Sequence, residues 1–166
     1  MLRAIIVDDE ELARQVLCEQ LRDAGGVEVV AECANGFEAV KSITELRPDL
    51  LFLDIQMPKL DGFEVLELID DRTASVIFVT AYDQYALKAF DVHALDYLLK
   101  PFDDERFARA LERAKSQMAA REINQLSERL LALLEERETE RKGTAREPAY
   151  LTRLMIKASS RMMLQG

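Results

Sequence analysis

Short segments of apolar residues alternate along the chain with longer segments in which apolar residues recur every three or four positions. The short segments cover residues 3–7, 27–33, 50–54, 75–79 and 96–99. Their length and their aliphatic or β-branched content are typical of strands, whereas the recurrence between them is typical of amphipathic helices. The pattern therefore predicts five strands, each followed by a helix.

The first predicted helix shows the recurrence most clearly, and it ends at Gly25 and Gly26, which favour a helix terminus. Its apolar residues are Leu12, Val16, Leu17 and Leu21. Further helices are expected over 39–46, 63–69 and 84–92. Regular alternation of strands and helices requires a parallel sheet that is covered on both faces. We predict a doubly wound α/β domain over residues 1–118, with a five-stranded parallel sheet of flavodoxin-like order 2-1-3-4-5 and a long C-terminal helical extension.

Asp54 follows the most apolar of these segments, residues 50–53. A continuous apolar run is typical of a strand buried on both faces, and ligands and reactive groups collect at the carboxyl ends of such strands. Taken alone, however, Asp54 fits better an aspartate that caps a helix or lies in a loop.

Polar residues stand at the same end of four of the five predicted strands: Asp8 and Asp9, Asp54, Thr80, and Lys100. Because these ends meet at one edge of a parallel sheet, we expect the side chains to lie close together. Three converging carboxylates repel one another, and Mg²⁺ would compensate because it prefers oxygen ligands. A phosphoryl group on Asp54 would then meet the metal ion, the Lys100 ammonium and the Thr80 hydroxyl. The alternative is an acidic edge that one lysine neutralises, without any chemistry.

Composition and charge narrow the functional classes. The chain has 166 residues and a net charge of −9, with 49% hydrophobic and 32% charged residues. Residues 1–102 hold 9 Lys/Arg and 20 Asp/Glu, a balance of −11, and the remaining 64 residues hold 13 and 11, a balance of +2. The first part should therefore bind nucleic acid poorly.

The cellular location follows from what the sequence lacks. The start of the chain does not have the layout of a signal peptide, and no apolar run reaches membrane-spanning length. Cys18 and Cys33 have no metal-binding spacing and are expected to be free thiols. These features favour a cytoplasmic protein without a membrane partner.

Five sequence motifs resemble the receiver domain of bacterial response regulators, and the resemblance covers residues 2–118. They are Ile6-Val7-Asp8-Asp9-Glu10, Leu53-Asp54-Ile55-Gln56-Met57-Pro58, Asp61-Gly62, Thr80-Ala81 and Tyr97-Leu98-Leu99-Lys100-Pro101-Phe102. Residues 78–101 are also similar to receivers of the LytTR (LytR/AlgR) family of transcription regulators. The resemblance implies a two-component phosphorelay protein that controls transcription.

The resemblance also implies a role for each matching residue near the strand ends. Asp54 would be the phosphoacceptor, modified by a sensor histidine kinase. Asp9 would bind Mg²⁺ directly and Asp8 through a water molecule, together with Asp54 and the backbone carbonyl of Gln56. The chain would not be an enzyme beyond self-catalysed phosphotransfer and dephosphorylation.

Three further positions would form the switch that the resemblance implies. Lys100 would pair with the phosphate, with a cis bond to Pro101. Thr80 would move toward the phosphoryl group, and Tyr97 would move inward with it; the alternative for Tyr97 is an ordinary strand aromatic. The switch would alter the face made by the fourth helix, the fifth strand and the fifth helix, where apolar residues of 84–92 either pack the helix or mediate dimerisation. Those apolar residues are Tyr85, Leu87 and Phe90.

The segment after the receiver-like domain carries a second apolar stripe. Phe107, Leu111, Ala114 and Met118 suit docking on the sheet, whereas Ile123, Leu126, Leu130 and Leu133 are one residue out of phase with them. A slip of one residue turns the stripe by about 100° around the helix. We therefore interpret residues 119–148 as a helical linker that forms a coiled coil with a second copy, giving a homodimer. The alternatives are a helix that folds back on its own domain or one that is partly frayed.

Residues 149–166 resemble the opening strand of a LytTR DNA-binding domain that is truncated here, by a natural or an artificial end. DNA would be bound only through the missing output domain, and residues 149–166 are expected to be disordered without it. Two other functions fit parts of the sequence. One is a stand-alone receiver that acts as a binding adaptor. The other is an aspartyl-phosphate phosphatase of the haloacid dehalogenase type, in which position 56 would be a second aspartate instead of Gln56.

Overall fold

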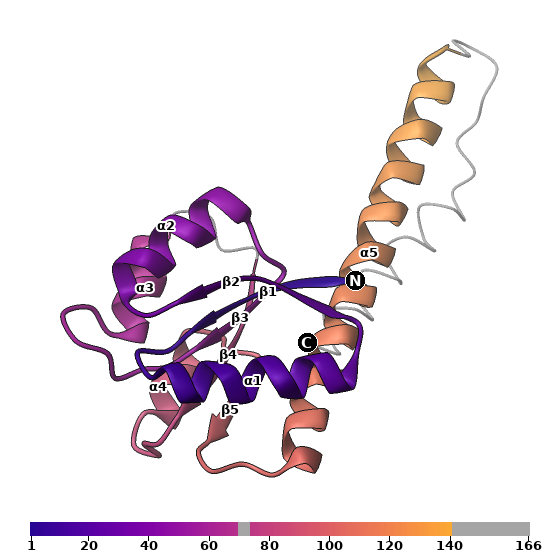
Figure 1. The fold of residues 1–166 in the computed structure, drawn as a ribbon. Helices are drawn as coiled ribbons and strands as arrows, with labels where there is room; N and C mark the ends of the chain where they lie inside the picture. Colours follow the sequence, from indigo (N-terminus) through magenta and orange to yellow (C-terminus); the bar gives the residue numbers. More distant parts are fainter. Residues whose placement is uncertain (70–73, 141–166) are drawn as a thin grey trace. The chain divides into compact units, whose positions relative to one another are not determined.

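Five parallel strands form a single sheet in the order β2-β1-β3-β4-β5 (Figure 1). The computed structural model describes residues 1–69 and 74–140. The strands are β1 (Leu2–Val7), β2 (Val27–Cys33), β3 (Leu50–Leu53), β4 (Ser75–Thr80) and β5 (Asp96–Leu99). The predicted fold class and strand order are confirmed.

In the described part of the chain, five helices alternate with the strands. They are α1 (Glu11–Ala24), α2 (Gly36–Leu46), α3 (Gly62–Leu68), α4 (Ala86–Asp91) and α5 (Asp104–Glu140). Polar side chains fix several of their starts. The Asn35 side chain accepts a hydrogen bond from the Glu38 amide, and Asp103 accepts one from the Arg106 amide. Such caps satisfy amide groups that have no partner within the helix.

The helices cover both faces of the sheet and create two hydrophobic cores. One core packs α2, α3 and α4 on the sheet, and the other packs α1 and the first part of α5. Alternate residues of β3 enter different cores: Leu51 and Leu53 belong to the first, Leu50 and Phe52 to the second. This division explains why residues 50–53 read as one continuous apolar run.

The first helix forms as predicted, but only two of its four apolar residues face the core. Leu17 and Leu21 are buried, but 72% of Leu12 and 45% of Val16 are exposed. A helix turns by about 100° per residue, so Leu12 and Val16 form one row and Leu17 and Leu21 form another, which lies over the sheet. The spacing of four residues within each row suits a helix, yet only one row faces the core.

The first part of α5 docks as its apolar residues predict. Phe107, Leu111 and Ala114 are buried, together with Ala110, while Met118 is partly buried against the same core. Contacts between residues divide the chain into two units, Met1–Ala120 and Arg121–Gly166.

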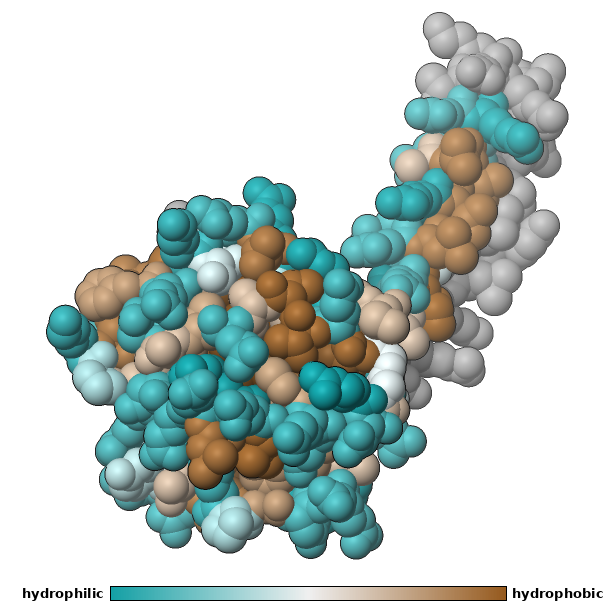
Figure 2. Space-filling view, in the orientation of Figure 1, coloured by the Kyte–Doolittle hydropathy of each residue, from teal (hydrophilic) through white to brown (hydrophobic). Residues whose placement is uncertain are grey.

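The second apolar stripe of α5 is exposed. Ile123, Leu126, Leu130 and Leu133 each expose between 53% and 59% of their surface. In Figure 2 a continuous apolar strip follows this second part of the helix. The interpretation of residues 149–166 as the start of a DNA-binding domain lies outside the described residues. In the described part of the chain, no helix combines the length and apolar character that a membrane crossing requires.

Candidate functional site

Three carboxylates meet at the carboxyl ends of β1 and β3. The register pairs Val7 with Leu53, so the residues that follow them, Asp8 and Asp54, emerge side by side. Each of Asp8, Asp9 and Asp54 offers a carboxylate oxygen, and these oxygens lie within 4.8 Å of one another. Asp8 and Asp54 are buried, at 1% and 8% exposure, and Asp9 is exposed. This convergence of Asp8, Asp9 and Asp54 agrees with the prediction from the sequence.

Lys100 reaches this carboxylate cluster from the end of β5. Its Nζ lies 2.7 Å from Oδ2 of Asp8 and 3.6 Å from Oδ2 of Asp54. Burial works to lower the pKa of Lys100, but the hydrogen bond to Asp8 and the charges of Asp8 and Asp54 outweigh it and raise the pKa. Lys100 therefore remains an ammonium group, and in this state its closer partner is Asp8.

Asp54 is a desolvated carboxylate. Burial raises the pKa of Asp54, and the charge of Asp8 raises it further, while Lys100 and a hydrogen bond from Thr80 act in the opposite direction. Its Oδ1 accepts a hydrogen bond from the Ile55 amide at 2.7 Å. A carboxyl group with a raised pKa, close to a lysine and at the carboxyl ends of parallel strands, is typical of a functional site.

Gly62 allows α3 to begin directly against the backbone of Asp54. A Cβ atom at Gly62 would lie 2.5 Å from the Asp54 carbonyl oxygen and 3.1 Å from Cα of Ile55. The Gly62 amide also donates a 2.8 Å hydrogen bond to the Ile55 carbonyl. The close approach requires glycine, which is the physical reason for the Asp61-Gly62 motif in the sequence.

The three carboxylates fit a hard divalent cation. Mg²⁺ and similar ions take oxygen ligands, and two buried acids with one exposed acid offer such oxygens on one side while leaving the other side open to water. The residues present can therefore hold a metal ion. The role of the Gln56 carbonyl as a further ligand stays a prediction.

Thr80 and Tyr97 both contact the backbone of Tyr82. Thr80 is fully buried, and its hydroxyl accepts a 3.4 Å hydrogen bond from the Tyr82 amide. The Tyr97 hydroxyl donates to the Tyr82 carbonyl, and its ring lies 6.4 Å from that of Phe78. The two predicted switch residues are therefore connected through one backbone segment. The Lys100–Pro101 bond is cis, as expected.

The apolar residues before and within α4 divide between core and surface. Tyr85 is partly buried and packs against the first core. Leu87 and Phe90 are exposed, at 82% and 80%. The packing interpretation therefore holds for Tyr85, and the other two side chains face solvent in this chain.

Two interactions near the site were missed from the sequence. Asp96, buried at the start of β5, receives two hydrogen bonds from the Arg106 guanidinium, at 2.5 and 3.0 Å. Gln56, two residues after Asp54, donates its side-chain amide to the Tyr85 hydroxyl at 2.9 Å. The only sequence signal for Asp96 was a charged residue opening an apolar strand. The Gln56–Tyr85 contact had no signal, because it joins exposed or half-buried polar atoms 29 positions apart.

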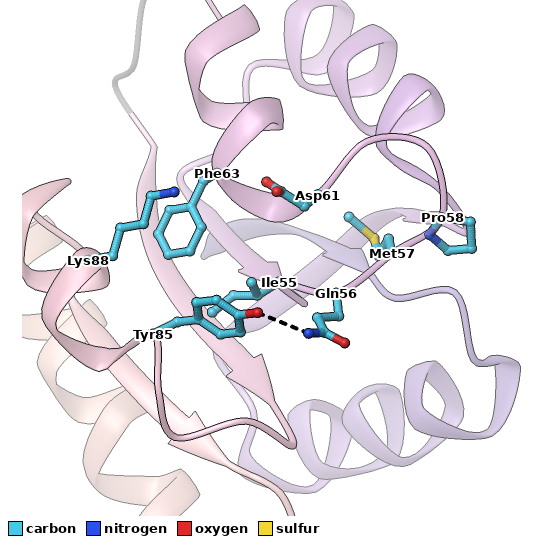
Figure 3. A pocket seen from close by; sticks show the side chains of 8 residues that line it. All are labelled: Ile55, Gln56, Met57, Pro58, Asp61, Phe63, Tyr85 and Lys88. Carbon is cyan, nitrogen blue, oxygen red and sulfur yellow. Dashed lines mark hydrogen bonds between the residues drawn. The ribbon is translucent and has the colours of Figure 1, made fainter.

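An open hollow lies between the loop after β3 and α4 (Figure 3). Its volume is about 390 Å³, and the Phe63 and Tyr85 rings, with Lys88, stand on the side of α3 and α4. The Lys88 ammonium lies 4.5 Å from the centre of the Phe63 ring. Gln56, which is two residues after the phosphoacceptor candidate Asp54, also lines the hollow. The hollow therefore lies close to Asp54 along the chain.

Known proteins resemble this chain in sequence and in structure. A family model described as "Response regulator receiver domain" matches residues 4–112. An uncharacterized response regulatory protein of Yersinia pestis is 52% identical over 114 residues, which cover 68% of this chain and 48% of that protein. The transcriptional regulatory protein BtsR of Salmonella typhi is 43% identical over 134 residues, which cover 80% of this chain and 56% of BtsR.

Solved structures agree with the sequence relatives. The response regulatory domain of protein mrkE from Klebsiella pneumoniae superimposes with a TM-score of 0.66 and is 31% identical, covering 70% of this chain and 97% of that one. The present chain spans about half the length of the curated relatives it matches.

Proposed function

Because this chain belongs to the family of response regulator receiver domains of bacterial two-component systems, we propose that Asp54 accepts a phosphoryl group from a sensor histidine kinase. The observation that supports this most strongly is the position of Asp54, which is buried beside two further carboxylates and 3.6 Å from the Lys100 ammonium. We assign the chain as a phosphoacceptor and not as an enzyme with turnover on a separate substrate.

The transfer is a simple displacement at phosphorus. A carboxylate oxygen of Asp54 attacks the phosphorus of a phosphohistidine; a P–O bond forms, the P–N bond breaks, and the imidazole leaves with the bonding electrons. Lys100 would pair with a phosphoryl oxygen, and the Thr80 hydroxyl would donate to another. Mg²⁺, held by the three carboxylates and the Gln56 carbonyl, would supply neutralisation of the phosphoryl charge.

Labelling of the whole chain with acetyl phosphate tests this proposal. With Mg²⁺ present, intact mass should increase by one phosphoryl group in the wild type and in Asp23→Asn, a control that changes an exposed aspartate of α1. Asp54→Asn should take up none, because an amide cannot form the acyl phosphate. Uptake by Asp54→Asn at the wild-type rate would remove Asp54 from this role.

We further propose that the phosphorylated receiver controls transcription through a LytTR-type output domain. Support comes from BtsR, whose name describes a transcriptional regulator and of which this chain covers little more than half. The acidic balance of residues 1–102, −11, also favours a DNA contact outside the receiver. Thr80 and Tyr97 would alter the α4-β5-α5 face on phosphorylation.

A homodimer is the assembly that we propose for this regulator. The exposed stripe of Ile123, Leu126, Leu130 and Leu133 repeats with 3-4-3 spacing, as in a two-stranded coiled coil. A second copy of the same helix would bury it. This proposal is tested below, at the scale of the whole molecule.

A further inference from the structure

The start of α4 is held by few contacts. The helix has six residues, no side-chain hydrogen bond caps its first turn, and Ala89 is its only buried residue. Leu87 and Phe90 project into solvent. A short helix with one buried side chain gains little from packing, so the residues at its entrance determine where it lies.

Tyr85, the residue directly before α4, makes contacts through both its ring and its hydroxyl. Its ring lies 6.2 Å from that of Phe63 and 6.4 Å from that of Tyr82, measured between centres. Its hydroxyl accepts the 2.9 Å hydrogen bond from Gln56 (Figure 3). Because both residues also line the 390 Å³ hollow, this bond joins the loop after β3 to α4 at the margin of an open space.

Gln56 is mechanically close to the phosphoacceptor. Two peptide units separate it from Asp54, and the intervening Ile55 amide donates to Asp54 Oδ1 at 2.7 Å. A phosphoryl group on Asp54 changes the charge and geometry of the carboxyl group that accepts this bond. The Asp54–Ile55 peptide carries this amide and would respond to that change, and the Gln56 side-chain amide would then shift relative to the Tyr85 hydroxyl.

We propose that Gln56 and Tyr85 form a latch that holds the start of α4 against the phosphoacceptor loop while Asp54 is unmodified, and that a change at Asp54 reaches α4 through this pair. Neither side chain contacts the reacting atoms, so both are positioning residues. The route differs from that of Thr80 and Tyr97, whose hydrogen bonds are made with the backbone of Tyr82. The inference rests on the proposed phosphorylation of Asp54.

Hydrogen exchange of the α4 amides in the whole chain tests the latch. Tyr85→Phe removes the hydroxyl and keeps the ring, and Gln56→Met removes the amide at similar volume. Each single variant should exchange the amides of residues 86–91 roughly two- to tenfold faster than the wild type, as loss of one hydrogen bond allows. If the two groups act together, the double variant should exchange no faster than either single variant.

Two matched variants separate the latch from a general loosening. Tyr82→Phe removes a hydroxyl from the neighbouring ring and should exchange like the wild type. Gln56→Glu should restore slow exchange, because its carboxylate can accept the Tyr85 hydroxyl proton, and should fail to do so when combined with Tyr85→Phe. Additive effects of Gln56→Met and Tyr85→Phe, or unchanged exchange in Tyr85→Phe, would overturn the latch.

Hydrogen exchange in the presence of beryllofluoride and Mg²⁺ tests whether a change at Asp54 reaches α4. In the wild type these should speed exchange at 86–91, and in Tyr85→Phe the further change should be at most half as large on a logarithmic scale. An equal change in both proteins would overturn transmission through the pair. A wild type that is neither labelled by acetyl phosphate nor altered by beryllofluoride would instead refute the phosphoacceptor role, whereas the exchange of the unmodified variants reports on the latch alone.

Discussion

Lys100 illustrates how one side chain serves two partners at the scale of the residue. Its ammonium neutralises Asp8, which is 1% exposed, from 2.7 Å, and it stands farther from Asp54. Two buried acids with one cation leave a surplus of negative charge. The site is therefore arranged to favour an added cation.

Replacing Lys100 should show how far the stability of the fold depends on a cation at this site. Lys100→Met leaves the buried Asp8 carboxylate without this partner and should lower the free energy of unfolding by about 1–3 kcal/mol. Added Mg²⁺ should recover part of the loss, because the ion replaces the missing positive charge. Urea unfolding with and without Mg²⁺ measures both effects. Lys41→Met, on the exposed side of α2, is the control; an equal loss there would contradict the assignment.

Gly62 gives a second prediction at this scale. Gly62→Ala would bring a methyl group against the Asp54 carbonyl oxygen, and the backbone can relieve this only by moving. We expect a loss of about 1–3 kcal/mol in unfolding free energy and slower labelling by acetyl phosphate. Gly36→Ala, which meets the Leu60 side chain instead, should cost stability without slowing the labelling. Similar labelling rates for both variants would argue against a positioning effect of Gly62.

At the scale of the element, an ion pair fastens α5 to β5. Burial tends to raise the pKa of Asp96, but the hydrogen bonds from Arg106 and from the Tyr97 amide outweigh it and hold the pKa below its usual range. The pKa in the folded state is therefore lower than in the unfolded state. The pair stabilises the fold at neutral pH, and this contribution disappears as the pH falls below about 4 toward the folded-state pKa.

Arg106→Met should reveal this pH dependence. At pH 7 we expect a loss of about 1.5–3 kcal/mol in unfolding free energy, because Asp96 loses its two hydrogen bonds from Arg106. The loss is limited because Arg113 remains as a weaker partner of Asp96 at 3.5 Å. At pH 3 the loss should be smaller, since Asp96 is then increasingly protonated. Denaturant unfolding at both pH values is the measurement. Arg109→Met, exposed on the same helix, should change little at either pH; a loss that does not depend on pH would show that Arg106 acts by packing.

The sequence predicted individual elements well where they depend on hydrophobic periodicity and on residues close to one another in the chain. The bounds of β2 and β5 agree with the structure, and the polar residues at the strand ends converge because parallel strands leave no other arrangement. The sequence did not show that Leu12 and Val16 of α1 are exposed, because spacing along a helix does not say which row faces the sheet. Contacts such as Gln56–Tyr85 depend on side-chain positions that only the folded backbone sets.

At the scale of the whole molecule, the exposed stripe of α5 predicts association. Leu126→Asp with Leu130→Asp should weaken the dimer at least about tenfold, because charges replace apolar contacts at the centre of the stripe. Light scattering over a concentration series, with and without beryllofluoride, gives the dissociation constant. Gln125→Asp with Ala132→Asp, exposed residues off the apolar stripe, should leave it unchanged.

A shorter chain distinguishes the two surfaces that could associate. A chain that ends at Met118 lacks the stripe and should be monomeric at concentrations where the whole chain dimerises. If the shorter chain dimerises equally well, the contact must lie on the receiver, and the α4-β5-α5 face becomes the candidate. Dimerisation of the shorter chain only with beryllofluoride would assign a second, signal-dependent contact to that face.

The division of β3 between two cores has a consequence for the direction of signalling. Sliding or tilting this strand would misplace Leu50 and Phe52 on one side and Leu51 and Leu53 on the other at the same time. Asp54 therefore follows a strand that is held by packing on both of its faces. A covalent change at Asp54 would therefore displace the surrounding loops and not the strand. The signal that we propose for Asp54 would therefore reach the surface through the loops that follow the strands.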